Sequence, residues 1–327
     1  NAMFEILKIQ TIRTLLISFF VFTSPLVLAQ SSPIKLMVGF PAGGGTDAIA
    51  RILAEKLSYF LGVPVTVENR AGNGGQIAAQ ALKIAPPDGT VLFLSHDHTI
   101  SILPIINKNS GYDPKKDFVP VAGFASFANG FALSGNFLNK SLDEFLQSVR
   151  IQQQGKASVG VPATQSVPEL LVKSLAKQFE LDLIAIPYKG SAPMIADMVS
   201  NQMNSGVASV PDFIKFQKAG MLHMVAVMGT SRQAILPDTP TFAELGIKGF
   251  EDLSYYGIFA PKGTPTATID RFSLALKNVV ELPQIQQKLS ALGLTIEYMT
   301  SDTLSQRESI YSKNWAQIIA RMGVTAQ

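Results

Sequence analysis

The feature that most constrains this chain is a glycine-rich loop set between a short apolar run and a helical pattern. Residues 35–40 are predicted to form a buried strand that ends at Pro41. Gly43, Gly44 and Gly45 carry no Cβ, so their backbone can turn sharply and approach a ligand closely. Thr46 or Asp47 can cap the helix that follows. Because unpaired N–H groups at a helix start bind anions, the loop predicts a site for a small, negatively charged ligand.

Short apolar runs alternate with helical periodicity along the rest of the chain. This order favours α/β domains with largely parallel sheets. The predicted strands cover residues 35–40, 63–68, 91–95, 119–124, 157–161, 183–187, 203–208 and 224–228. The predicted helices cover residues 47–61, 75–85, 141–153, 167–179, 192–201, 211–219, 268–282 and 301–322, and residues 253–260 read as an extended segment.

The N-terminal region has the layout of a secretory signal peptide, residues 1–29, in which residues 1–2 are interpreted as a tag. Two basic residues precede an uncharged apolar run at 15–22, and Ala29 offers a small residue for cleavage. A retained membrane anchor is the alternative, because residues 14–34 carry no charge and are long enough to span a bilayer. Pro25 interrupts that run and favours cleavage, which predicts a periplasmic protein.

Composition narrows the class of protein further. The 327 residues are 47% hydrophobic and 16% charged, which is typical of a folded protein, and the formal net charge is +3. Lysine and arginine do not cluster in runs, so a nucleic-acid partner is not expected. The sequence holds no cysteine, which suits an oxidising compartment without requiring disulfides. At this length two domains can each bury a core.

Shifts in composition predict that the chain crosses twice between two domains. Glycine, asparagine and serine cluster at 127–139, and the extended segment near residue 255 can lead back to the first domain. The predicted division is residues 30–127 and 256–327 for domain 1 and residues 128–255 for domain 2. Two crossings make a hinge, and a ligand would lie in the cleft between the lobes.

The first glycine loop also fits a dinucleotide-binding fingerprint. Gly43, Gly45 and Ala48 have the required spacing, and Glu68 ends the next predicted strand near where a ribose-binding acid is expected. An NAD-linked oxidoreductase that uses the Gly43–Ala48 loop is therefore the alternative function. An exported protein meets no pool of nicotinamide cofactor, which favours a binding loop, and a purely structural glycine turn is the third interpretation.

Further loops repeat the strand–loop–helix arrangement. Residues 69–75 follow the second predicted strand, so two sets of free N–H groups would share the carboxyl edge of one sheet, where open α/β sheets bind ligands. In the second half, residues 163–170 and 187–193 do the same, and these loops would face the first pair across the cleft. Tyr188 can contact a ligand, while Lys189 either adds positive potential or is simply solvated.

The histidines and nucleophiles give weak signals for chemistry. His96 and His98 are spaced for one side of an extended segment, but one further histidine, His223, completes the set and no acidic cluster accompanies it. Because a zinc site normally needs three protein ligands, no metal is expected, and His96 is interpreted as a hydrogen-bond donor in the cleft. No serine is clearly joined to a histidine and an acid, so no catalytic residue is predicted.

Several segments together resemble the Bug/TctC family, the extracytoplasmic solute receptors of tripartite tricarboxylate transporters. They occur in the order of the family and span nearly all of the chain after the signal peptide. The matching pieces are Phe40-Pro-Ala-Gly-Gly-Gly-Thr-Asp47, Val65-x-Val-Glu-Asn-Arg-x-Gly-x-Gly-Gly75, Pro87-Asp-Gly89, Pro187-Tyr-Lys-Gly-x-Ala-Pro193, Leu236-Pro-Asp-x-Pro-Thr-x-x-Glu-x-Gly246 and Ala260-Pro-x-Gly-Thr-Pro265.

The resemblance implies two α/β lobes of the periplasmic-binding-protein type, joined at a hinge and closing on a small carboxylate without chemistry. It also implies membrane transporter subunits as partners, a monomeric receptor and no cofactor. The ligand-binding residues that it implies are Phe40, Pro41, Ala42, Gly43, Gly44, Gly45, Thr46, Asp47, Asn69, Gly72, Asn73, Gly74, Gly75, Ser95, His96, Asp97, Ala163, Thr164, Gln165, Ser166, Pro187, Tyr188, Lys189, Gly190, Ala208 and Ser209.

Two departures from the family pattern bear on the ligand. Where the family usually has a Gly-x-Gly-Ser loop followed by His-Leu, this chain has Ala163-Thr-Gln-Ser166 and then Glu169-Leu170. Where the family often has Phe-Asp-Asn, this chain has Val207-Ala208-Ser209. Ala208 would remove a partner for a ligand ammonium, so the sequence predicts a plain or aromatic carboxylate rather than an amino acid.

Overall fold

The computed structural model describes residues 32–137 and 140–324. The chain from Pro33 onward forms one compact unit, and the account below concerns that unit. The predicted signal peptide and its cleavage point near Ala29 lie outside the described residues. In the described part, no helix combines the length and the apolar character needed to cross a membrane.

The first lobe is built on a six-stranded mixed sheet with the order β11-β4-β10-β3-β1-β2. Strand β1 pairs in parallel with β2 and β3, whereas β10 runs antiparallel to β3 and β4, and β4 runs antiparallel to β11. The expectation of largely parallel sheets is therefore only partly correct. The strands are β1 (Ile34–Val38), β2 (Val65–Asn69), β3 (Val91–His96), β4 (Phe118–Phe127), β10 (Ser254–Pro261) and β11 (Thr295–Met299).

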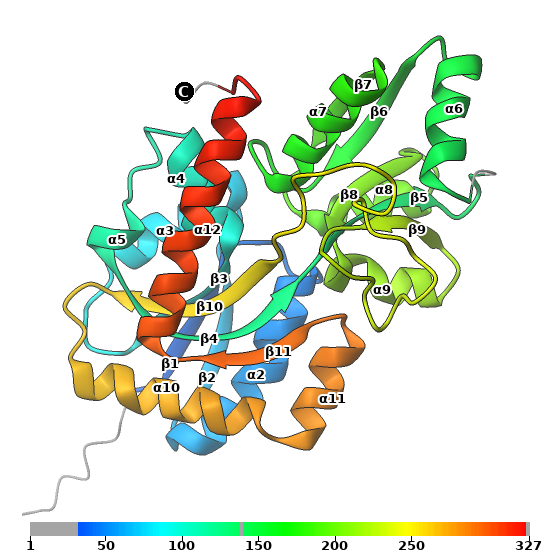
Figure 1. Ribbon diagram of the computed structural model, residues 1–327. Helices are drawn as coiled ribbons and strands as arrows, with labels where there is room; N and C mark the ends of the chain where they lie inside the picture. The colour runs from blue at the N-terminus through cyan, green and yellow to red at the C-terminus, as the bar shows by residue number, and fades with distance from the viewer. Residues whose placement is uncertain (1–31, 138–139, 325–327) are drawn as a thin grey trace, which may run out of the picture. The chain divides into compact units, whose positions relative to one another are not determined.

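Helices cover both faces of this sheet (Figure 1). Leu36 and Val38 of β1 pack with helices α2, α10 and α11, while Met37 belongs to the core on the opposite face with α3, α4 and α12. Burial on both faces explains why β1 is a nearly continuous apolar run. The helices are α2 (Gly45–Leu61), α3 (Gln76–Lys83), α4 (Leu103–Ile106), α5 (Pro114–Asp117), α10 (Thr266–Val280), α11 (Pro283–Ala291) and α12 (Ser301–Arg321), with the short turns η1 (Asn73–Gly75) and η2 (His98–Ile102).

The second lobe is built on a five-stranded mixed sheet with the order β7-β6-β8-β5-β9. Strand β6 runs parallel to β7 and β8, and β5 runs antiparallel to β8 and β9. The strands are β5 (Asn129–Ser134), β6 (Lys156–Val161), β7 (Asp182–Pro187), β8 (Ser205–Ser209) and β9 (Leu222–Val227). The helices are α6 (Leu142–Gln152), α7 (Val167–Phe179), α8 (Ser191–Val199) and α9 (Val210–Lys218).

The chain passes between the two lobes twice. Strand β4 of the first sheet ends at Phe127, and after Ala128 strand β5 of the second sheet begins. The return follows β9 and ends where β10 enters the first sheet at Ser254. The predicted boundaries at 127/128 and 255/256 fall close to these strand ends, and the division itself stays a prediction.

The lobes also touch outside the hinge. Lys218, in the last turn of α9, donates a hydrogen bond from Nζ to the carbonyl oxygen of Ala291 at the end of α11, at 3.2 Å. A Cβ added at Gly293 would come within 2.5 Å of Val210, so these two segments also approach closely. Both contacts lie away from the cavity described below.

Most of the predicted strands and helices are present, with ends shifted by a few residues. Helix α7 begins at Val167 and ends at Phe179 as expected. The sequence analysis missed strand β5, which runs through the segment interpreted as a boundary, and also α4, α5, α11 and β11. His96 and His98 do not lie on one extended segment, because β3 ends at His96 and η2 begins at His98.

Candidate functional site

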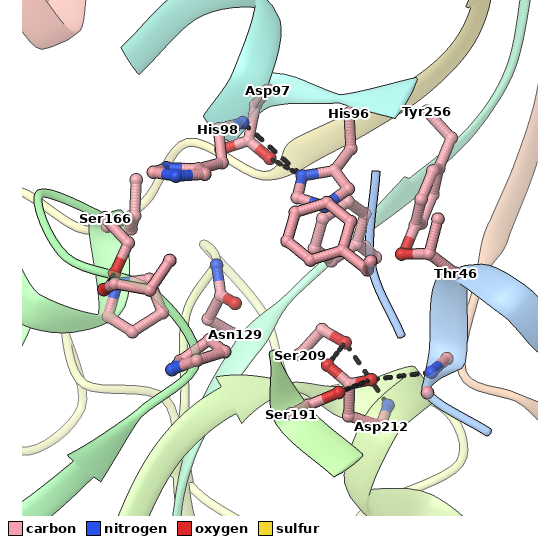
Figure 2. Close-up of a pocket in the computed structure, with 18 residues that line it drawn as sticks. Thr46, His96, Asp97, His98, Asn129, Ser166, Ser191, Ser209, Asp212 and Tyr256 are labelled. Atoms are coloured by element: carbon pink, nitrogen blue, oxygen red, sulfur yellow. Dashed lines mark hydrogen bonds and ion pairs between the residues drawn. The ribbon is translucent and has the colours of Figure 1, made fainter. Parts of the chain in front are cut away.

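A pocket lies where the two lobes face each other at the hinge. The first turns of four helices, α2 from the first lobe and α7, α8 and α9 from the second, contribute to its lining. Figure 2 shows its polar side chains gathered at separate ends. The lining residues are Phe40, Gly44, Gly45, Thr46, His96, Asp97, His98, Phe127, Asn129, Pro162, Ala163, Ser166, Val167, Pro168, Ser191, Ser209, Asp212 and Tyr256.

At one end of the pocket the start of α2 is bonded to a carboxylate of the other lobe. The Gly45 amide donates a hydrogen bond of 2.7 Å to Asp212 Oδ1. The hydroxyls of Ser191 and Ser209 donate to the same carboxylate, each at 2.6 Å. A negative charge is stabilised at a helix N-terminus, so Asp212 holds a place that a ligand carboxylate could otherwise take. We call Gly45, Asp212, Ser191 and Ser209 the occupied end.

Glycine is required at position 45 because the lobes meet there. A Cβ on Gly45 would lie 2.9 Å from Asp212 Oδ1 and about as close to the backbone of Pro211, at 3.1 Å. Backbone atoms of α9 cannot move aside without moving the second lobe. The absence of a side chain at residue 45 therefore allows the lobes to approach this closely.

The rest of the first glycine loop also forms hydrogen bonds within the protein. Asp47 accepts hydrogen bonds from the Gly43 amide, the Asn69 side chain and Arg51. Burial opposes the charged form of Asp47, but these hydrogen bonds outweigh it and lower its pKa. Asn69 also donates to the carbonyl oxygen of Phe40. Asp47 and Asn69 thus brace the two glycine loops against each other.

At the opposite end of the pocket a buried histidine has no partner. His98 is 5% exposed, and neither ring nitrogen has a hydrogen-bond partner among the described residues. Burial, assisted by the neighbouring His96, lowers the pKa of His98 to about 4, while Asp97 acts in the opposite direction. The imidazole is therefore neutral near pH 7 and offers one N–H donor and one acceptor. We call His98, Ser166 and Val167 the open end.

The second glycine loop fixes the position of His98. A Cβ on Gly74 would lie 2.2 Å from His98 Nε2, so the ring packs directly against the glycine backbone. The Thr99 hydroxyl donates to the Gly74 carbonyl oxygen at 2.8 Å, which ties the loop to η2. Gly74 has a φ of +64°, a conformation that glycine adopts at little cost.

Aromatic rings form one wall between the two ends. Phe40 stacks on His96 with ring centres 4.9 Å apart, and Phe127 and Tyr256 pack with centres 4.6 Å apart. The His96 ring meets both Phe127 and Tyr256 edge-on. Pro162, Ala163, Val167 and Pro168 of the second lobe supply the facing apolar surface.

Asp97, which also lines the pocket, connects to both hinge crossings. Its carboxylate accepts a hydrogen bond of 2.7 Å from the Tyr311 hydroxyl and lies 3.2 Å from His96 Nδ1. Burial opposes ionisation, but these interactions lower the pKa of Asp97. Tyr311 also lies 3.4 Å from Ser254, which lies 3.4 Å from the Asn129 amide. A chain of polar side chains therefore runs from the pocket to the first residues of β5 and β10.

A second hollow adjoins the pocket at the glycine loops. The Tyr188 hydroxyl donates to Asp197 at 2.7 Å, and burial together with this carboxylate raises the pKa of Tyr188 to about 12. Lys189 is exposed. The lining residues are Gly39, Phe40, Pro41, Gly72, Asn73, Gly74, Ala163, Thr164, Pro187, Tyr188, Lys189 and Gly190.

The predicted ligand residues divide among these places. The pocket brings together Phe40, Gly44, Gly45, Thr46, His96, Asp97, Ala163, Ser166 and Ser209. The adjoining hollow holds Pro41, Gly72, Asn73, Gly74, Thr164, Pro187, Tyr188, Lys189 and Gly190, and shares Phe40 and Ala163. Neither is lined by Ala42, Gly43, Asp47, Asn69, Gly75, Ser95, Gln165 or Ala208.

Several lining residues were not on the predicted list. Asp212 follows Ser209 in a Ser-x-x-Asp pattern whose serine does cap α9, accepting from the Asp212 amide at 3.2 Å. That pattern indicates a helix start rather than a ligand site. His98 was considered with His96 only for a metal site, and Val167, Pro168 and Ser191 lie in the loop segments 163–170 and 187–193 without being predicted as ligand residues. The role of the others depends on packing: Phe127, Asn129, Pro162 and Tyr256. Within residues 32–137 and 140–324, no group of three or more histidine and acidic side chains could hold a metal ion.

Comparison with known proteins places the chain in a family. Residues 49–324 match the model of the tripartite tricarboxylate transporter family receptor, TctC. The chain belongs to this family. A Cupriavidus necator relative, the UPF0065 protein in the gbd 5′ region, is 30% identical over 89% of this chain and 88% of its own length.

Solved structures of TctC-like proteins share the fold. The periplasmic binding protein BugD superposes with a TM-score of 0.85 at 30% identity, covering 90% of this chain and 99% of BugD. An R. palustris protein solved with adipate gives the same TM-score at 26% identity, with the same coverage of the two chains. The predicted two-lobed fold and the resemblance to the Bug/TctC receptors are thus confirmed.

Proposed function

We propose that this TctC-family receptor is exported to the periplasm, binds a small organic carboxylate in the pocket between its lobes and delivers it to membrane transporter subunits. The family match and the likeness to BugD, a periplasmic binding protein, support the receptor role. The adipate held by the R. palustris protein supports a carboxylate ligand. The observation that carries the proposal in this chain is the unpartnered, buried imidazole of His98.

An unpartnered polar group is costly to bury, so His98 indicates an external partner. Leaving a buried donor unsatisfied costs on the order of 1–3 kcal/mol, whereas a hydrogen bond to a charged acceptor is worth about 1.5–3 kcal/mol. A carboxylate oxygen can accept the imidazole N–H. His98 is held in place by Gly74 and lines the pocket together with Ser166, so a ligand reaches it without rearrangement of the loop.

The helices around the pocket favour a negative charge. Helix α7 begins at the open end with Ser166 as its cap, whereas α8 and α9 begin at the occupied end of the same lobe, beside Asp212. Each of these N-termini carries partial positive charge that falls off within the first turn. The start of α7, together with the neutral imidazole of His98 as a donor, can bind one carboxylate without a lysine or arginine.

Binding couples to the hinge. The ligand would contact residues of both lobes, so closing the lobes excludes water and completes the hydrogen bonds. Three or four charge-assisted hydrogen bonds, offset by the cost of ordering and closure, give a net binding free energy of about −8 kcal/mol, which corresponds to a micromolar dissociation constant. The closed form would then be what the transporter recognises.

We also propose binding without chemistry. Asp212 at the Gly45 amide places a negative charge where the alternative oxidoreductase would need to hold a pyrophosphate. Glu68, the acid expected on the ribose, forms ion pairs with Lys35 and Arg70 instead. Family membership supports the receptor role and gives no support to a dehydrogenase.

A ligand panel tests the proposal. The protein is unfolded in guanidinium chloride and refolded to remove any carried-over ligand, and it is then titrated by calorimetry with acetate, benzoate, malate, adipate and citrate. The corresponding amides serve as neutral controls. At least one carboxylate should bind with a micromolar dissociation constant and raise the melting temperature, and the amides should not.

The matched variants are His98→Leu and His223→Leu. Loss of His98 should weaken the best carboxylate at least tenfold, because about 1.4 kcal/mol or more of hydrogen-bond energy is lost. His223 contacts the Lys140 carbonyl oxygen far from the pocket. The His223→Leu variant should therefore bind the carboxylate within about twofold of the wild-type affinity. If no carboxylate of the panel binds, the proposed function is wrong.

A further inference from the structure

The charged residues of the pocket restrict the charge of the ligand, which membership of the TctC family leaves open. Asp97 and Asp212 both line it, and its described lining residues include neither lysine nor arginine. His98 stays neutral because burial lowers its pKa to about 4. The protein therefore places two carboxylates, and no lysine or arginine, around the ligand at neutral pH.

A second carboxylate on the ligand would meet the charge of Asp212. One carboxylate fits the open end, where the His98 imidazole has an unpaired N–H donor and helix α7 begins. Asp97 lies beside His98 at the open end, with both oxygen atoms bonded to Tyr311 and His96, so any other end of the ligand must extend toward Asp212. Like charges at short range repel strongly in a partly buried site, where salt screens them little. The pocket thus selects against dicarboxylates and tricarboxylates.

The two acids are also poor partners for a ligand ammonium. Asp212 already accepts hydrogen bonds from Gly45, Ser191 and Ser209, and Asp97 from Tyr311 and His96. Protein donors thus engage both oxygen atoms of each carboxylate. Ala208 lies in β8 and does not line the pocket. An amino acid would have to displace internal hydrogen bonds to place its ammonium.

The body of the ligand lies between apolar walls. The rings of Phe40, Phe127 and Tyr256 line the pocket on the first-lobe side. Pro162, Val167 and Pro168 lie on the second-lobe side. A flat apolar group gains contact with rings on one face and aliphatic carbons on the other, and aromatic pairs gain energy beyond their buried area.

We infer that the receptor binds an aromatic monocarboxylate, of which benzoate is the simplest, with its carboxylate at the His98 end and its ring between the two walls. This inference rests on the proposed function, which requires only that some carboxylate binds. It goes further by limiting the ligand to one negative charge and a planar apolar body.

Matched probes separate charge, shape and size. Calorimetry on the stripped protein compares benzoate with terephthalate, which adds a second carboxylate, and with cyclohexanecarboxylate, which loses the planar ring. Benzoate should bind at least about tenfold more tightly than terephthalate, malate or citrate and about threefold more tightly than cyclohexanecarboxylate. L-phenylalanine should bind at least about tenfold more weakly than 3-phenylpropanoate, which lacks the ammonium.

The variant Asp212→Asn tests the charge argument without changing shape. Asparagine keeps an oxygen for the Gly45 amide but removes one negative charge from the pocket. The preference for benzoate over terephthalate should narrow by about tenfold in this variant. Phe40→Leu, which removes one ring of the wall, should weaken benzoate by at least about threefold and narrow its advantage over cyclohexanecarboxylate.

The outcomes distinguish a failure of this inference from a failure of the proposed carboxylate-binding function. Malate, citrate or terephthalate binding as tightly as benzoate would overturn the inference and leave the carboxylate receptor intact. The same holds if L-phenylalanine matches 3-phenylpropanoate, or if Asp212→Asn leaves the benzoate preference unchanged. If none of the carboxylates binds the stripped protein, both the inference and the proposed function fail.

Discussion

The two ends of the pocket use similar elements in opposite ways. At the occupied end the start of α2 carries the three-glycine motif, and its Gly45 amide is bonded to the protein's own Asp212 at 2.7 Å. At the open end the start of α7 carries no glycine motif, yet beside it His98 has two buried nitrogens without partners. The conspicuous motif serves to join the lobes, and the inconspicuous end is the one left for a ligand.

This contrast shows what a glycine-rich loop can and cannot indicate. The motif identifies a helix start with exposed amides and room for close approach. It does not identify which anion accepts hydrogen bonds from these amides. In this chain that anion is 167 residues away in sequence, on a helix of the other lobe. Substitutions at either end should therefore have different consequences.

The largest effect is expected from Gly45→Ala. Its Cβ would lie 3.1 Å from the backbone of Pro211, so the lobes could not reach their present separation. Binding of the best carboxylate should weaken at least a thousandfold, about 4 kcal/mol, while each lobe still folds. Calorimetry measures the binding affinity, and circular dichroism measures whether the lobes are folded. Gly44→Ala is the control, because its Cβ would meet the movable hydroxyl of Ser191, and it should change affinity by less than about fivefold.

Acid should destabilise the protein through His98. Its pKa is lowered from 6.5 in the unfolded chain to about 4 in the folded one, so the unfolded state binds the proton more readily. The stability due to a neutral His98 is complete above pH 6.5 and is lost as pH falls toward 4. The loss should reach about 3 kcal/mol in the free energy of unfolding.

Urea denaturation at several pH values tests this dependence. The slope between pH 6.5 and 4 should shrink in His98→Leu and persist in His223→Leu. An unchanged slope in the first variant would show that His98 is not the buried neutral group described here.

A smaller effect is expected from Ser191→Ala at the occupied end. The change removes the 2.6 Å hydrogen bond to Asp212 and leaves its charge less well satisfied. The free energy of unfolding should fall by about 1.5 kcal/mol, as for other hydrogen bonds to charged groups. Chemical denaturation measures it, and no loss of stability would mean that Asp212 finds an equivalent donor.

The smallest effect should come from Tyr256→Phe. The hydroxyl shares a 3.1 Å hydrogen bond with Thr46, and the ring forms part of the aromatic wall. Removing only the hydroxyl should lower the free energy of unfolding by about 1 kcal/mol and keep the wall in place. A large loss of affinity, measured by calorimetry, would indicate that the hydroxyl itself contacts the ligand.

The order of strands and helices could be predicted from the sequence because it depends on local patterns. Buried strands such as β1 are continuous apolar runs, and helices such as α7 show both a cap and a periodic apolar face. Strand β5 escaped prediction because its glycine, asparagine and serine also suit a linker. The mixed direction of the first sheet follows from the pairings of β10 and β11, and that of the second sheet from the pairings of β5; these pairings join segments far apart in the chain.

The site could be predicted in part. The glycine loops marked where strands give way to helices, and several of their residues do line the pocket, as does Asp97. Asp212 and His98 were missed for one physical reason. Whether a carboxylate is paired, or an imidazole is left without a partner, depends on contacts between elements that the local sequence does not specify.

The contact between Lys218 and Ala291 has a consequence for the range of concentrations that the receptor detects. It joins the lobes outside the pocket, so if it breaks when the lobes open, it would add the same increment to the closed arrangement whichever molecule is held. Strengthening or weakening it rescales every dissociation constant by one common factor and leaves their ratios alone. Sensitivity would then depend on residues other than those that set selectivity, and one could change without the other.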